Sequence, residues 1–316
     1  MKLLKNTAVA ALLAAASTIG AWADSSDPIR LPMNEWTGQH ISARILGTLL
    51  EKLGYTVEYP TAGAVPQFKA IADGDLDMQP EVWTNNVGDV YPKAVESGDI
   101  VVLGQLGLKP QEGWIFPPYM ADKCPGLPSY EALYDCAQAF AAADTFPKGR
   151  LITYPADWGT RSKDVVAMIE LPFEPVAGGS EGAMIAELKS AAAAGDPILM
   201  MFWQPHWIFA ELDFDWVAWD AAEGECVEES GQKRGSACGF QQATIDKIVS
   251  KDFATKWPGA HKLMEVMSID NATQNVLMLE IDNKGRKLEE VIAEWVDANE
   301  ATWGPWVEAA KAAMSS

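Results

Sequence analysis

The sequence predicts an α/β fold in two domains, on the strength of its length, its composition and its alternating pattern. At roughly 100–200 residues per domain, 316 residues suffice for two. Hydrophobic residues make up 48% and charged residues 22%, which is typical of a folded globule and not of a disordered chain. Short apolar segments alternate with segments of helical periodicity, which predicts parallel sheets with helices on both faces.

The first third of the chain shows the alternation most clearly. Ile41, Ile45, Leu49 and Leu53 fall on one helical stripe, and Gly54 is expected to end that helix. Strands are expected at residues 29–31, 56–59, 76–83 and 100–103, with helices at 41–53, 65–72 and 87–96.

The pattern repeats after Gly113. Strands are expected at residues 114–116, 151–153 and 198–202, with helices at 129–142, 162–169 and 181–193. From about Pro258 onward the chain is expected to be mostly helical.

The N-terminus has the layout of a secretory signal. Lys2 and Lys5 precede a small apolar run, and Ala21-Trp22-Ala23 is a cleavage site of the A-x-A kind. We expect residues 1–23 to be removed, leaving a 293-residue exported, periplasmic protein. A retained membrane anchor is the alternative, although the apolar run is short for a bilayer.

Charge excludes two classes of partner. The chain has 44 acidic and 24 basic side chains and a net charge of -20. A protein that binds nucleic acid needs a basic surface to displace counterions from phosphate, so no nucleic-acid partner is expected. The same repulsion disfavours anionic membrane surfaces.

An exported protein meets an oxidising compartment, where cysteines pair. Three pairings of Cys124, Cys136, Cys226 and Cys238 are possible. The simplest joins Cys124 to Cys136 and Cys226 to Cys238, each closing a short loop worth about 3 kcal/mol. A zinc site built from all four is the rival, but zinc ligands usually come in closer pairs.

Tryptophan is abundant, with 13 residues, and four of them share a setting. Trp36, Trp83, Trp158 and Trp203 each stand beside turn residues near the end of an expected strand. Ligands of open α/β sheets bind at such ends. Indole faces hold a methylated ammonium at about 2 kcal/mol each, so four would supply roughly 8 kcal/mol, near micromolar affinity. Core packing is the alternative for any one of them.

Several sequence runs then resemble a known family. The chain is similar to the substrate-binding proteins of ABC importers for glycine betaine, choline and related methylated amines, in the runs at residues 35–38, 49–55, 74–77, 81–83, 157–159 and 203–206. The resemblance implies a two-lobed, hinged periplasmic binding protein fold (type II). It also implies a protein that is not an enzyme and that delivers ligand to a transporter permease with its ATPase subunits.

The resemblance also assigns the aromatic cage. It places cage positions on Trp83, Trp158 and Trp203, and its choline-type members add aromatic residues at Trp36 and Trp114. Those members carry an Asp where this chain has Gly38, and a glycine betaine site carries a His where this chain has Val87. Both departures favour a smaller ligand, trimethylamine N-oxide, with glycine betaine or choline as the alternatives.

The polar end of such a ligand needs a partner. The amides of Gly159 and Thr160 follow a cage Trp and precede an expected helix, whose start offers free N–H groups. Glu81 and Glu131 are the candidate carboxylates near the cage. His40 and His206 flank cage segments, but a loop or core hydrogen-bonding role is the more common one for such residues.

We expect one lobe to comprise residues 24–109 and 229–316 and the other residues 110–228. The protein is expected to be a monomer without cofactor or catalytic residues. No metal site is assigned, although Asp213, Asp215 and Asp220 leave a surface metal open.

Two other functions have some support in the sequence. Gly178 to Gly182 matches the G-x-S-x-G of serine hydrolases, but Pro172 and Pro175 argue against the central strand that must precede it. Ser180 is therefore interpreted as the N-cap of the next helix. A sugar-binding protein would need more polar side chains around the indoles than these motifs carry.

Overall fold

The computed structural model describes residues 25–84, 87–219, 240 and 243–314. The expected signal peptide, the expected lobe boundary at residues 228–229 and the Cys226–Cys238 pair lie outside the described residues. So does Asp220. In the part of the chain that is described, no helix is both long enough and apolar enough to cross a membrane.

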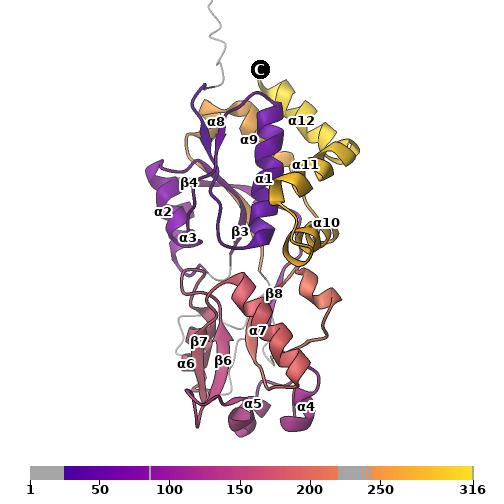
Figure 1. Ribbon diagram of the computed structural model, residues 1–316. Helices are drawn as coiled ribbons and strands as arrows, with labels where there is room; N and C mark the ends of the chain where they lie inside the picture. The colour runs from indigo at the N-terminus through magenta and orange to yellow at the C-terminus, as the bar shows by residue number, and fades with distance from the viewer. Residues whose placement is uncertain (1–24, 85–86, 220–239, 241–242, 315–316) are drawn as a thin grey trace, which may run out of the picture.

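Two lobes are stacked end to end, as Figure 1 shows. Lobe 1, the upper half in that view, contains two small sheets. Strands β1 (Ile29–Arg30) and β2 (Val57–Glu58) form a parallel pair. The second sheet has the order β3 (Met78–Trp83), β10 (Ile245–Ser250), β4 (Ile100–Gln105).

Helices cover the sheets of lobe 1. From the first part of the chain come α1 (Thr37–Lys52), α2 (Pro66–Asp73) and α3 (Val90–Glu96). The C-terminal part supplies α8 (Phe253–Lys256), α9 (Pro258–Val266), α10 (Asn271–Met278), the π-helical turn η3 (Leu279–Asn283), α11 (Leu288–Ala298) and α12 (Glu300–Met314). The predicted helical C-terminus is confirmed.

Lobe 2, the lower half, is built on one five-stranded sheet. Its order is β7 (Phe173–Ala177), β6 (Gly149–Thr153), β8 (Met200–Gln204), β5 (Gln111–Phe116), β9 (Asp215–Trp216). Around it lie α4 (Met120–Lys123), α5 (Ala132–Cys136), the 3-10 turn η1 (Ala137–Phe140), α6 (Arg161–Met168), α7 (Glu181–Ala194) and η2 (Trp207–Ala210).

The prediction of parallel sheets is confirmed only in part, because both larger sheets are mixed or antiparallel. In lobe 1, β10 pairs antiparallel with both β3 and β4, and in lobe 2, β5 pairs antiparallel with β8 and β9. The parallel pairs are β1 with β2 in lobe 1, and β6 with β7 and β6 with β8 in lobe 2. In lobe 1, β10 comes from the C-terminal part of the chain and inserts between two strands of the N-terminal part, a long-range pairing that the local alternation does not reveal.

Most other predicted elements lie where the pattern placed them. Ile41, Ile45 and Leu49 of α1 are fully buried, as their common stripe predicts. The expected helix over residues 129–142 is only the short α5 followed by η1. Ser129 forms a β-bridge with Ala218, which keeps the first residues of that segment out of a helix.

The segment before Ser180 confirms the interpretation of its prolines. Phe173–Ala177 does form a strand, β7, but it is the edge strand of its sheet, where Pro175 need not donate to a second neighbour. Ser180 is the N-cap of α7, and its hydroxyl oxygen accepts a hydrogen bond from the Ala183 amide at 3.2 Å. The central strand that must precede a hydrolase nucleophile is therefore not present before Ser180.

Cys124 and Cys136 form a disulfide, as predicted. It closes a loop at the far end of lobe 2, where α4 and α5 lie (Figure 1).

We predict that replacing both cysteines, Cys124→Ser with Cys136→Ser, lowers the free energy of unfolding by about 3 kcal/mol, because the unfolded chain regains the freedom of the loop. Chemical denaturation monitored by tryptophan fluorescence measures the change. Ligand affinity should stay at the wild-type value, since the loop is remote from the contact between the lobes, and a large loss of affinity would contradict this assignment.

Candidate functional site

A cavity of about 40 Å³ lies between the two lobes. Lobe 1 contributes Trp36, Ala64, Gln67, Glu81, Trp83 and Val87 to its lining, and lobe 2 contributes Glu112, Tyr154, Trp158 and Trp203. Both halves of the molecule therefore form the walls of one small space, which is where a hinged protein holds its ligand.

The four tryptophans that the sequence singled out all line this cavity. Trp36 is the N-cap of α1, and Trp83 is the last residue of β3. Trp203 lies near the end of β8, and Trp158 lies in the turn between β6 and α6. Each is at most 9% exposed, so the indole faces are shielded from water, which strengthens any interaction with a cation.

The aromatic rings meet across the lobe boundary. The ring centroids of Trp36 and Trp158 are 5.1 Å apart, with the planes inclined by 62°. Trp158 stands at 72° to Trp203, with 5.6 Å between centroids, and Tyr154 lies 5.7 Å from Trp158. Inclined rings at these distances are in edge-to-face contact and form adjoining walls of the cavity that they line.

Glu81 holds two of the indoles. It is 1% exposed, and its Oε1 accepts hydrogen bonds from Nε1 of Trp36 and Nε1 of Trp83, both at 3.0 Å. Its Oε2 accepts from the Ser42 hydroxyl at 2.6 Å and from Nε2 of Gln274 at 2.9 Å. Four donors compensate the buried carboxylate, and the carboxylate in turn fixes the orientation of both rings.

A network of hydrogen-bonded, buried side-chain amides adjoins Glu81 within lobe 1. The Gln79 side-chain oxygen accepts from the Glu81 amide at 3.2 Å and from Nε2 of Gln39 at 3.0 Å. Nε2 of Gln79 donates to Oδ1 of Asn34 at 2.9 Å and to Oε1 of Gln67 at 2.6 Å. Such a connected network has one favourable arrangement, so it makes the floor of the cavity rigid.

Lobe 2 supplies a second polar wall. The Tyr154 hydroxyl donates to Oε1 of Glu112 at 2.8 Å, and both residues are buried. Burial, and then the neighbouring Glu112, raise the pKa of Tyr154 well above its ordinary value. The phenol therefore remains a hydrogen-bond donor throughout the neutral range.

Other expected site residues lie away from the cavity. Trp114 is fully buried in lobe 2, where its ring packs against Trp219 and its Nε1 donates to Ser162 at 3.0 Å. Trp114 is therefore a core residue. The hydroxyl of Thr160, the N-cap of α6, donates to Asp164 at 2.8 Å, and neither Gly159 nor Thr160 lines the cavity. Glu131 is an exposed residue at the start of α5.

Sequence reasoning missed Glu112, Tyr154, Gln67 and Ala64. Tyr154 directly follows β6, so the rule that selected the tryptophans would also have found it. Glu112 stands at the start of β5, and that end of the strand reaches the cavity because β5 runs antiparallel to β8 and pairs Glu112 with Trp203. The α2 residue Gln67 gave no signal in the sequence.

One group of side chains in the described residues has the composition of a metal site. Ligand atoms of Glu181, His206 and Asp282 lie within 4.8 Å of one another. However, Nδ1 of His206 accepts a hydrogen bond from the Ile208 amide at 3.1 Å, so the ring proton is on Nε2, 3.3 Å from Glu181. A protonated nitrogen cannot ligate, and these residues do not fit a metal. The four-cysteine zinc site is likewise excluded, because Cys124 and Cys136 are bonded to each other.

The two histidines near the cage have the hydrogen-bonding roles expected of them. Nε2 of His40 lies 2.6 Å from the Asn34 carbonyl oxygen, and His206 packs edge-on against the Trp203 ring. Neither lines the cavity.

We predict that Glu81→Gln lowers the free energy of unfolding by about 1.5–3 kcal/mol, the value of a hydrogen bond to a charged group. A glutamine amide presents one oxygen and one NH₂ group to a site where all four neighbours donate, so at least one donor loses its acceptor. Denaturant titration measures the loss. The exposed Glu96→Gln is the matched control and should stay within about 0.5 kcal/mol of wild type; equal effects of the two would contradict the role of Glu81.

Comparison with known proteins places these features in context. Residues 27–298 match the family OpuAC, described as the substrate binding domain of ABC-type glycine betaine transport systems. The trimethylamine N-oxide-binding protein of Pelagibacter ubique (strain HTCC1062) is 26% identical over 294 residues, which cover 90% of this chain and 92% of that protein. The glycine betaine/proline betaine-binding periplasmic protein of Escherichia coli (strain K12) is 25% identical over 305 residues, covering 91% and 90%.

Solved structures share the fold. Lactococcal OpuAC in its closed-liganded conformation with glycine betaine superposes with a TM-score of 0.72 at 21% identity, covering 89% of this chain and all of that one. A choline-binding protein of an ABC transporter, in complex with choline, gives a TM-score of 0.73 at 18% identity, covering 91% and 98%. The match over residues 27–298 shows that this chain belongs to the family of substrate-binding domains of ABC-type glycine betaine transport systems, which are binding proteins and not enzymes.

Proposed function

We propose that this protein captures trimethylamine N-oxide between its lobes and delivers it to an ABC importer. The observation that carries the proposal is the convergence of four indoles, two from each lobe, on one buried cavity. The methylated ammonium group cannot donate strong hydrogen bonds, and aromatic faces are the groups that bind it best.

The charge of the cavity lining supports a ligand without a carboxylate. Among the described lining residues there is no Lys, Arg or His, whereas two glutamates, Glu81 and Glu112, come from opposite lobes. Acidic walls stabilise the positive nitrogen and repel the carboxylate of glycine betaine. We place the three methyl groups against the indoles, with the positive nitrogen held between the acidic walls of the two lobes.

The two positions that depart from the family patterns agree with this choice. Val87 lines the cavity where a glycine betaine site would present a His, and an isopropyl group offers no donor to a carboxylate. A side chain at Gly38, such as the Asp of choline-type members, would press on the Gln274 amide, because a Cβ there would lie 3.2 Å from Nε2 of Gln274. That amide also donates to the Gly38 carbonyl oxygen at 3.0 Å.

Glycine betaine is the second candidate. It is favoured by the description of the family and by the Escherichia coli relative, which binds betaines according to its name. The Pelagibacter ubique relative favours trimethylamine N-oxide in the same way.

The expected setting follows from the family. Relatives named as periplasmic proteins, together with the secretory signal expected at residues 1–23, support a protein that works outside the inner membrane. Its partners would be a permease and the ATPase subunits that hydrolyse ATP for transport. We expect a monomer, since a single chain supplies all the cage walls.

We predict that alanine at Trp36, Trp83, Trp158 or Trp203 each weakens trimethylamine N-oxide binding by about 1–2 kcal/mol or more, because each removes one desolvated indole face. Isothermal titration calorimetry measures the dissociation constants. The matched control is Trp306→Ala in α12, remote from the cavity, which should bind like wild type. Wild-type affinity in all four cage variants would show that the ligand binds elsewhere.

A competition series tests the choice of ligand. Titration of the wild-type protein with trimethylamine N-oxide, glycine betaine, choline and a neutral sugar should rank trimethylamine N-oxide first and give no binding of the sugar. The acidic lining is the reason for the low rank of the betaine. Micromolar glycine betaine binding with no response to the N-oxide would reverse the assignment.

A further inference from the structure

We propose that Glu181 and Asp282 form a latch across the lobe boundary that holds the closed form shut and sets how long the ligand stays bound. The latch is separate from the cage, and the proposal rests on the binding function proposed above. It is carried by cross-lobe hydrogen bonds at the start of α1.

Helix α1 has no N-terminal cap of its own. Its N-cap residue is Trp36, whose indole makes no capping hydrogen bond, and its first turn contains no acidic residue. The first amides of a helix need an acceptor and carry partial positive charge. Here the Thr37 amide donates at 2.8 Å to Oε2 of Glu181, which belongs to lobe 2. The cap of α1 is therefore supplied by the opposite lobe.

In a second contact across the boundary, the donor belongs to lobe 2 and the acceptor to lobe 1. Asp282 of lobe 1 accepts a hydrogen bond through Oδ2 from Nε1 of Trp207 in lobe 2, at 3.1 Å. Its Oδ1 accepts from the Thr37 hydroxyl at 2.6 Å. Thr37 thus joins the two acidic residues, through its amide to Glu181 and through its hydroxyl to Asp282.

The electrostatics show how closely closure brings the two carboxylates together. Burial, and then the Glu181 charge, raise the pKa of Asp282 to about 6. Nε2 of His206 lies 3.3 Å from Oε1 of Glu181 within lobe 2, and His206 is 2% exposed. Two donors face these carboxylates only when the lobes are together: the Thr37 amide, which donates to Glu181, and Nε1 of Trp207, which donates to Asp282.

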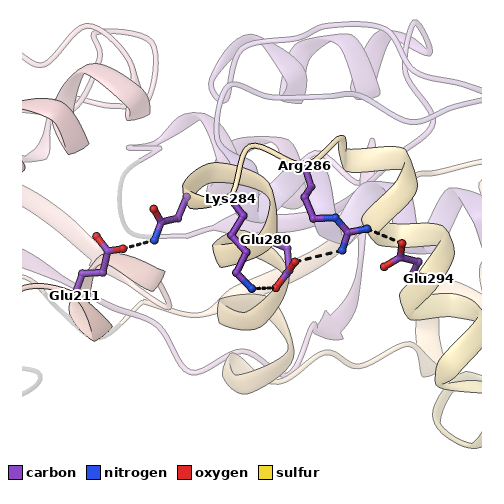
Figure 2. Close-up of polar contacts among 6 residues, drawn as sticks. Glu211, Glu280, Lys284, Arg286 and Glu294 are labelled. Atoms are coloured by element: carbon purple, nitrogen blue, oxygen red, sulfur yellow. Dashed lines mark hydrogen bonds and ion pairs between the residues drawn. The ribbon is translucent and has the colours of Figure 1, made fainter.

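The π-helical turn η3 presents Asp282 to lobe 2 on a rigid support. Figure 2 shows Glu280 of this turn contacting Lys284 and Arg286, and Arg286 continuing to Glu294 of α11 at 2.5 Å. The neighbouring Asn283 donates to Glu211 of lobe 2. One side of the turn is thus fixed within lobe 1 while its other side meets lobe 2.

The latch is next to the cage in the chain, which couples the two. Trp36 contacts Trp158 across the cavity, and the following residue, Thr37, contacts Glu181. A ligand that draws Trp36 toward lobe 2 also brings the start of α1 to its cap. Closure is favoured by the sum of contacts that exist only in the closed form, and the latch adds to those of the ligand.

The test compares Glu181→Ala and Glu181→Gln with Glu187→Ala. Glu187 lies on the same helix, α7, but pairs with Arg150 inside lobe 2, so it is a matched control without a cross-lobe contact. Dissociation of trimethylamine N-oxide, with glycine betaine and choline measured in parallel, is followed by stopped-flow tryptophan fluorescence. Thermal unfolding without ligand reports any purely structural effect.

We expect Glu181→Ala to speed dissociation about tenfold and Glu181→Gln to speed it less, because the amide oxygen still accepts from Thr37. Ligand-free stability should be unchanged, since open lobes do not make the contact, and Glu187→Ala should release ligand at the wild-type rate. Equal dissociation rates for wild type and Glu181→Ala would overturn the latch and leave the binding function intact. If the wild-type protein binds none of the three compounds, the proposed function fails, and the latch with it.

Discussion

The Glu81 carboxylate is the interaction on which the rest of the site depends. An ionised side chain that is 1% exposed is tolerated only because four donors face it, and two of these are the indoles of Trp36 and Trp83. The charge thus does two things. It fixes ring orientations that packing alone would leave loose, and it makes lobe 1's half of the cavity negative. The amides of Gln79 and Gln67 extend this rigid arrangement into the body of the lobe.

Lobe 2 contributes the other half of the site, but its two cavity indoles are not held by a shared carboxylate. Trp158 and Trp203 are held by packing against each other and against Tyr154, whose hydroxyl is bonded to Glu112. Neither half alone encloses a ligand, so binding energy becomes available only when the lobes meet. Thr37, one residue beyond a cage indole, links that closure to the carboxylates of Glu181 and Asp282. In the proposed function, affinity and closure both depend on the same short stretch at the start of α1.

The local sequence pattern was sufficient to predict several helices and the tryptophans that line the cavity. The stripe of Ile41, Ile45 and Leu49 predicted α1, and turn residues beside strand ends predicted which tryptophans share the cavity. Long-range pairing was not predictable: β10 inserts between β3 and β4 from more than a hundred residues away and leaves no local trace. Glu112 was not predicted because all strands were expected to be parallel. In fact β5 runs antiparallel to β8, so the first residues of β5, and not its last, reach the cavity. The register pairs Trp114 with Met201, two residues deeper in the sheet, which explains why that indole is in the core.

We propose that indoles of both lobes surround one onium group, and a crystal structure of the protein with trimethylamine N-oxide is the experiment to perform. We expect the ligand nitrogen within about 6 Å of the ring centroids of Trp36, Trp83, Trp158 and Trp203. Ligand density outside the space between the lobes, or in contact with the rings of a single lobe, would contradict it.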